Sequence, residues 1–185
     1  MYQNSTAMST SQHPSPAPAL TPSGPRQRIT PFLWFDHQAE AAAAFYVSVF
    51  RNSRILKIAR YGEATARATG RPPDSAMTVA FQLDGQEFVA LNGGPPFQFN
   101  EAISFVVNCE TQAEVDHYWD KLSQGGQTQP CGWLKDRYGV SWQVVPRILG
   151  ELVSGPDAAR AQRVMQAMLQ MVKLDLQGLQ QAAEG

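Results

Sequence analysis

The sequence predicts an α+β fold in which one strand–helix–strands unit occurs twice and a helix follows at the C-terminus. Short strand-like stretches alternate with two helical segments, and the last thirty residues carry apolar residues at helical spacing. The two units also share their aromatic residues, because Phe32 maps onto Phe105 and Phe45 maps onto Tyr118 with one constant offset. A duplicated module explains this spacing, and a coincidence of common aromatic residues is the alternative.

The composition is that of a soluble globular protein. The chain has 185 residues, 43% hydrophobic residues and a formal net charge of −1. This balance gives no basic surface for nucleic acid and no polybasic patch for a membrane, and the apolar runs are too short to cross a bilayer. The two cysteines are too few for a disulfide framework, so we expect a reducing compartment, the cytoplasm.

The chain divides into a tail and one domain. Residues 1–28 are rich in Ser, Thr, Pro and Ala without the apolar segment of a secretory signal, which predicts a disordered N-terminal tail. We expect residues 29–185 to form a single domain. It would contain two modules, at 29–97 and 102–146, and a C-terminal helix at 157–183.

The sequence predicts five successive segments in the first module. Residues 29–35 combine apolar and β-forming side chains and predict a strand, and the Ala-rich segment 37–50 predicts a helix capped by Asp36. Residues 54–62 predict a second strand. The Gly- and Pro-containing segment 62–75 predicts a mobile loop, in which charged residues are either solvated or part of a lid. A hairpin with its turn at Asp84–Gly85 completes the module.

The second module repeats this order. Residues 102–109 predict a strand, and residues 110–126 predict a helix with a capping box formed by Thr111 and Glu114. The next five residues leave room for one short strand. A hairpin with its turn near Tyr138–Gly139 then ends the module.

The C-terminal segment 157–183 predicts one long helix with an apolar stripe. The stripe consists of Val164, Met165, Met168, Leu169, Val172, Leu176 and Leu179. Such a stripe needs a partner surface, which is either the core of the same subunit or a second subunit. The sequence leaves both open.

Several motifs together resemble the vicinal oxygen chelate superfamily, which includes glyoxalase I, dioxygenases and antibiotic-resistance proteins. They are "ITPFLWFD", "VALNGGPPFQFNEAISFVVNC" and "CGWLKDRYGVSWQVVP". The chain is most similar to the branch named 3-demethylubiquinone-9 3-methyltransferase-like. The resemblance implies paired βαβββ modules that curl into cup-shaped mixed sheets, and a homodimer. The sequence lacks the Gly-rich loop and following acidic residue that a nucleotide-like methyl donor would normally require.

Metal-dependent members of this superfamily use four side chains from four strands, and the resemblance carries these positions onto Thr30, Ala90, Ala102 and Gln143. Divalent metals prefer imidazole and carboxylate ligands in such sites. Two alanines offer no donor atom, and a hydroxyl and a neutral amide are weak ligands. We therefore predict no metal and no cofactor.

Strand alternation predicts a small-molecule pocket in place of a metal centre. Six residues are predicted to bind the ligand: Thr30, Phe32, Trp34, Asn92, Ser104 and Gln143. Aromatic walls with a few amide and hydroxyl groups are typical of such pockets. The predicted function is metal-independent binding of an aromatic metabolite or antibiotic by a dimer. The alternatives are a metal-dependent lyase, isomerase or dioxygenase-like enzyme, or a methyltransferase.

Overall fold

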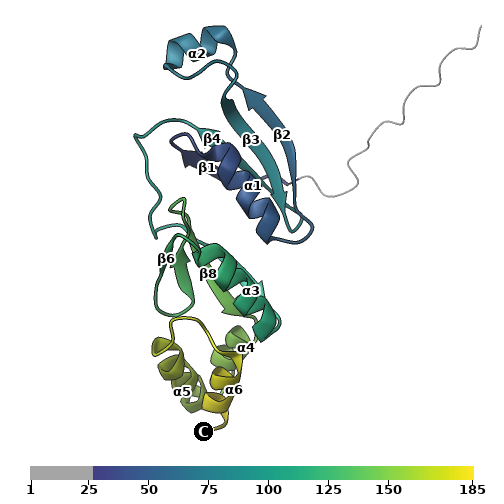
Figure 1. The fold of residues 1–185 in the computed structure, drawn as a ribbon. Coiled ribbons are helices and arrows are strands. Elements are labelled where there is room, and N and C mark those ends of the chain that lie inside the picture. Colours follow the sequence, from purple (N-terminus) through teal and green to yellow (C-terminus); the bar gives the residue numbers. More distant parts are fainter. Residues whose placement is uncertain (1–26) are drawn as a thin grey trace, which may run out of the picture.

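The fold was obtained as a computed structural model, which describes residues 27–185 (Figure 1). The predicted tail therefore falls, up to residue 26, outside the described residues. The first half of the chain contains β1 (Phe32–Phe35), α1 (Ala39–Val49), β2 (Arg54–Arg60), α2 (Glu63–Thr69), β3 (Ala76–Leu83) and β4 (Gln86–Asn92). The second half contains β5 (Phe105–Cys109), α3 (Gln112–Ser123), β6 (Gln127–Thr128), β7 (Trp133–Lys135) and β8 (Ser141–Pro146).

The two halves form mixed sheets of the same topology. The first sheet has the order β1-β4-β3-β2 and the second has the order β5-β8-β7-β6. In each, the first strand runs parallel to the last and the remaining neighbours are antiparallel. This is a βαβββ unit used twice, which confirms the predicted α+β fold with paired modules.

The first module differs from the prediction in two places. Asp36 does not cap α1, because Gln38 occupies the N-cap position and makes no side-chain capping bond. The segment predicted as a mobile loop contains α2, which ends at Gly70 in the left-handed conformation, with φ 68°. The hairpin turn lies at Asp84–Gly85 as predicted, and both residues have positive φ, as its tight turn requires.

The second module follows the prediction closely. The hydroxyl of Thr111 accepts a hydrogen bond from the backbone N–H of Glu114 at 3.2 Å and caps α3. The Glu114 carboxylate accepts from the backbone N–H of Glu110 at 2.7 Å, one residue earlier than in a standard capping box.

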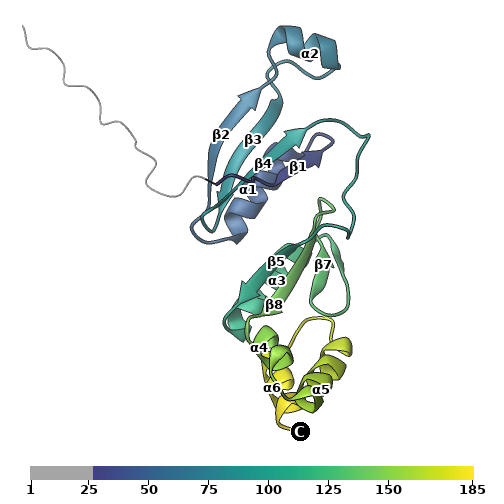
Figure 2. The ribbon, with the colours of Figure 1, turned by 180° about the vertical axis from the view of Figure 1, so that it is seen from behind.

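One hydrophobic core joins the two modules. It runs from the helix-covered face of the first sheet to that of the second, and Phe88 meets Phe105 with ring centroids 5.3 Å apart. The buried Asp136 carboxylate accepts hydrogen bonds from the Tyr46 hydroxyl on α1 and from Trp142 Nε1 on β8, both at 2.8 Å. Figure 2 shows the molecule from behind, with α1 and α3 lying beyond the strands.

The C-terminal segment is not the single helix that the sequence predicts. It forms α4 (Ile148–Ser154), α5 (Ala158–Leu169) and α6 (Leu176–Glu184), which pack around a small core of their own below the second sheet (Figure 1). Leu152, Val164, Leu174 and Leu179 are its buried centre, so the apolar stripe is partly buried within the same chain. None of the helices in residues 27–185 is long and apolar enough to cross a membrane.

Candidate functional site

Each sheet has one face packed on a helix and one open face. In the first sheet, Leu33 and Phe35 of β1 are buried beneath α1, whereas Phe32 and Trp34 point to the open side. The parallel register places Trp34 beside Leu91 of β4, so Val89 and Leu91 share the open face. Phe32 is 58% exposed there.

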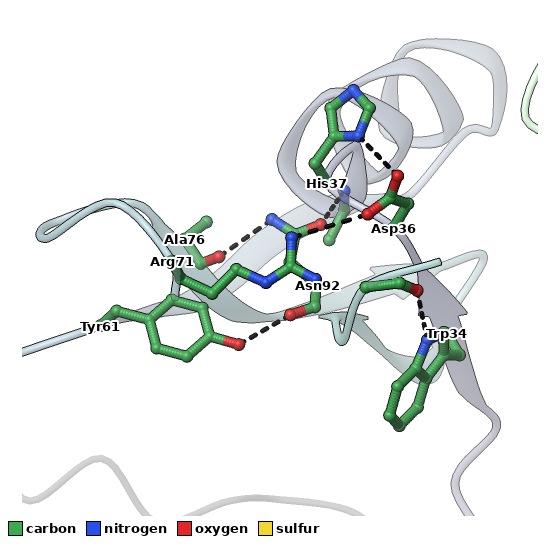
Figure 3. Close-up of polar contacts among 9 residues, drawn as sticks. Trp34, Asp36, His37, Tyr61, Arg71, Ala76 and Asn92 are labelled. Carbon is green, nitrogen blue, oxygen red and sulfur yellow. Dashed lines mark hydrogen bonds and ion pairs between the residues drawn. The ribbon is translucent and has the colours of Figure 1, made fainter. Parts of the chain in front are cut away.

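Trp34 is held against the chain segment that follows β4. Its Nε1 donates to the carbonyl oxygen of Gly94 at 2.9 Å, as Figure 3 shows. A Cβ on Gly93 would lie 2.2 Å from the indole, so only glycine permits this approach. Phe97 packs edge-on against the indole, with ring centroids 5.0 Å apart. Trp34 is therefore fixed in place and half-buried.

The prediction that Asn92 lines the same pocket as Trp34 is wrong, and Phe88 and Ala90 of β4 lie with Asn92. These three residues lie on the opposite face of the sheet, beneath α1, where Asn92 is 7% exposed. Asn92 Oδ1 accepts from the backbone N–H of Ala39 at 2.7 Å, and its Nδ2 donates to the carbonyl of Ala76 at 2.9 Å (Figure 3). Asn92 thus caps α1 from a neighbouring strand, in the place that the sequence assigns to Asp36.

Asp36 lies beside two basic side chains instead. Its carboxylate lies 3.6 Å from the Arg71 guanidinium and 3.3 Å from His37 Nδ1 (Figure 3). Arg71 also lies against Gly94, where an added Cβ would be 2.2 Å from its Nη2. These contacts join the segment after α2 to the backbone beside Trp34.

The open face of the second sheet carries a polar group. Gln143 of β8 donates from Nε2 to the Ser104 hydroxyl at 2.9 Å, so the structure brings these two predicted residues together. The strand registers place Gln143 between Val106 of β5 and Trp133 of β7. One apolar and one aromatic side chain thus flank the amide on this face.

Ser141 lies one step further along the same face of β8. The residue is 1% exposed, and its hydroxyl has no hydrogen-bond partner among the described residues. A buried hydroxyl without a partner costs free energy of about 1–3 kcal/mol, so this position favours an additional polar partner. Alternation predicts that Ser141 shares this face, but its lack of a partner has no signal in the sequence.

An ion pair borders this polar group. The Lys135 ammonium of β7 lies 2.7 Å from the Glu101 carboxylate, which also accepts from Gln129 Nε2 at 3.1 Å. The hydrogen bond from Lys135 lowers the pKa of Glu101 to about 2. Lys135 alternates with Trp133 and could have been recognised from the sequence. Glu101 lies outside every strand, and its position depends on the loop before β5.

The four positions that the resemblance assigns to metal ligands do not form a donor set. Thr30 precedes β1, Ala102 precedes β5, and Ala90 is buried beneath α1. The open-face residues of β4 beside Ala90 are Val89 and Leu91, which offer no donor either. Within residues 27–185, no three His, Cys, Asp or Glu residues are grouped so that they could hold a metal ion. The side chains present do not fit a glyoxalase-type divalent metal.

Comparison with known proteins identifies the family. The family model described as 3-demethylubiquinone-9 3-methyltransferase matches residues 27–145. A PhnB protein from Bacillus cereus, whose description carries the same family name, is 37% identical, and the alignment covers 65% of this chain and 99% of that chain with a TM-score of 0.59. No curated protein matches.

More distant structures share the fold alone. The protein PA1353 from Pseudomonas aeruginosa is 20% identical over 64% of this chain and 96% of that chain, with a TM-score of 0.53. The fosfomycin resistance protein FosX from Listeria monocytogenes is 16% identical over 73% of this chain and 100% of that chain, with a TM-score of 0.50. The family match ends where β8 ends, so α4–α6 lie outside it. The chain belongs to the family described as 3-demethylubiquinone-9 3-methyltransferase.

Proposed function

We propose that the protein binds a small molecule on the open face of the second sheet without using a metal. The observation that carries this proposal is the buried hydroxyl of Ser141, which lies beside the Gln143–Ser104 pair and has no hydrogen-bond partner within residues 27–185. Gln143 and the two serines offer donors and acceptors, and Trp133 and Val106 offer apolar surface. An aromatic metabolite or antibiotic with polar substituents has the matching chemistry.

A second copy of the chain would complete this site. Both open faces carry exposed apolar residues, of which Phe32 is 58% and Val106 is 50% exposed. Exposed apolar residues on a sheet face favour burial against a partner. The proposed homodimer brings Phe32 and Trp34 of one subunit over the polar group of the other. Two free cysteines, Cys109 and Cys131, are compatible with a cytoplasmic location.

The donor set supports binding without a metal. Gln143 stands where metal-dependent relatives are expected to carry Glu, and its amide is already engaged with Ser104. A neutral amide and two hydroxyls are weak ligands for a divalent cation, but they suit the polar groups of an organic ligand.

A thermal-shift screen of aromatic metabolites and antibiotics tests the proposal, because a ligand of the native state raises its apparent stability. A hit should lose its shift in Gln143→Ala and keep it in Gln127→Ala, since Gln127 lies exposed on β6. Light scattering should show a dimer that Phe32→Glu dissociates. Stoichiometric metal in the purified protein would favour the enzyme alternative. Saturable binding of S-adenosylmethionine would favour the methyltransferase, and either result would overturn the proposal.

A further inference from the structure

A cavity lies where the two modules meet, beside the open face of the second sheet. It has a volume of about 230 Å³ and lies between the β3–β4 turn and the edge strand β5. Its walls include Phe50, Leu83, Asp84, Val107, Tyr118 and Trp142. Val106 lies at its rim and also belongs to the open face, but Ser104, Ser141 and Gln143 are not among its lining residues, so the cavity is a separate site from the one in the proposed function.

Three aromatic rings form much of the cavity wall. Phe50 stacks on Tyr118 with ring centroids 5.1 Å apart and an interplanar angle of 26°. Phe50 also lies 5.4 Å from the Trp142 ring. Trp142 Nε1 donates to Asp136, so its one polar hydrogen is not available to a ligand. These rings therefore offer carbon surface and π faces, which attract cations as well as apolar groups.

Asp84 supplies a negative charge at the edge of the cavity. It is the one ionisable lining residue besides Tyr118, and within residues 27–185 its carboxylate makes no ion pair. Burial raises the pKa of Tyr118, the Glu114 and Asp84 carboxylates raise it further, and Arg51 opposes them. Among the described residues that line the cavity, Asp84 is the one carboxylate.

We propose that this cavity binds a small organic cation that carries a single ring. The ring lies against Phe50 and Trp142, and the ammonium group lies beside Asp84. The volume is below the usual range of about 300–1,000 Å³ for ligand pockets, which limits the ligand to about one ring. The free edge of β5 also presents backbone carbonyls to which an ammonium can donate.

Titration of the full chain with benzylamine tests this site, with benzyl alcohol as the neutral analogue. We expect benzylamine to bind saturably and more tightly than benzyl alcohol in isothermal calorimetry. Asp84→Asn removes the charge and keeps a residue that tolerates the positive φ of 43°. The affinity for benzylamine should fall about three- to fivefold, while the affinity for benzyl alcohol stays unchanged.

Asp74→Asn is the matched control. Asp74 is also exposed and has a positive φ of 61°, but it does not line the cavity. Its variant should bind benzylamine as the wild type does. An equal loss in both variants, or no loss in Asp84→Asn, would show that Asp84 does not recognise the cation and would overturn the proposal.

Amide chemical shifts locate the bound benzylamine independently of these variants. We expect perturbation of Asp84, Val107 and Tyr118, which belong to three different elements around the cavity. Perturbation confined to Ser104 and Gln143 would place benzylamine on the open face and refute this site. Absence of binding at millimolar benzylamine would refute it as well.

Discussion

Asn92 connects three parts of the first module through one buried residue. Its side chain caps α1 at Ala39 and binds the backbone of β3 at Ala76. Its backbone carbonyl accepts from the Tyr61 hydroxyl at 2.7 Å, which ties the start of the α2 segment to β4 (Figure 3). Each of these groups is buried, so water cannot replace a lost hydrogen bond. Asn92 therefore acts as a structural connector.

Replacing Asn92 by alanine should destabilise the protein by about 2–4 kcal/mol, because one N–H and one carbonyl would remain buried without partners. Urea unfolding followed by circular dichroism measures this loss. Asn108→Ala is the control, since Asn108 is exposed on β5 and its substitution should change stability by less than about 0.5 kcal/mol. Similar losses in both variants would contradict the connector role.

Asp136 is the second residue whose surroundings predict a measurable effect. Its carboxylate accepts four hydrogen bonds, from Tyr46, Trp142 and the backbone N–H groups of Tyr138 and Val140. Burial raises its pKa above the usual 3.8, although these hydrogen bonds act in the opposite direction. The ionised group is therefore costly to bury but fully bonded.

Asp136→Asn should destabilise the protein at pH 7 by about 1–3 kcal/mol, because an amide has one acceptor oxygen and cannot serve both the Tyr46–Trp142 pair and the two backbone N–H groups. The difference from the wild type should also depend on pH. A pKa raised in the folded state contributes stability that is fully present below the unfolded value of 3.8 and is lost as pH rises through the folded value. The stability gap should thus be largest in acid and narrow as pH rises; a gap that widens would contradict this assignment.

Trp34 and Asn92 also show what strand alternation can and cannot predict. Alternation within β1 correctly places Phe32 with Trp34, and alternation within β8 correctly separates Gln143 from Trp142. Alternation does not decide which of the two alternating sets of β4 side chains lies on the same face as Trp34, because that depends on the register between the strands. The register pairs Trp34 with Leu91, so Asn92 lies on the opposite face from Trp34.

At the level of elements, the three C-terminal helices are attached to the second sheet by a short turn. Backbone N–H groups of Cys131 and Gly132 donate to the carbonyls of Met171 and Val172, each at 2.8 Å. Leu174 is buried in the same turn, close to Gly132. Apolar residues recur at helical spacing throughout 157–183, including the turn between α5 and α6. The sequence pattern therefore predicts one helix, whereas contacts of this turn with the sheet divide the segment into two helices.

Leu174→Ala should destabilise the protein by about 2–5 kcal/mol, because it leaves a cavity between the helices and the sheet. Leu169→Ala is the matched control. Leu169 is 59% exposed, and the same truncation there should cost less than about 0.5 kcal/mol. Chemical denaturation of both variants measures the difference, and equal effects would show that the turn does not anchor the helices.

At the scale of the whole molecule, the two modules share one core and leave two open faces. The fold class and the repeated module follow from the sequence because aromatic spacing and turn residues occur twice along it. The contacts between the modules do not, since Tyr46 and Asp136 lie 90 residues apart and meet only in the folded chain. Aromatic side chains from both modules, including Phe50, Tyr46 and Trp142, close this contact.

The shared core predicts that the two modules unfold as one cooperative unit. Separation of the modules would expose Phe88, Phe105 and Trp142 to water and break the hydrogen bond from Tyr46 to Asp136. Opening of one module alone is therefore unfavourable in free energy. Hydrogen exchange should give the same opening free energy for amides of β4 and β8. Tyr46→Phe should lower the opening free energy of both strands equally, because it removes the hydrogen bond between the modules. Exchange in β4 at a much lower free energy than in β8 would show that the first module opens independently and that the core between them does not couple their stability.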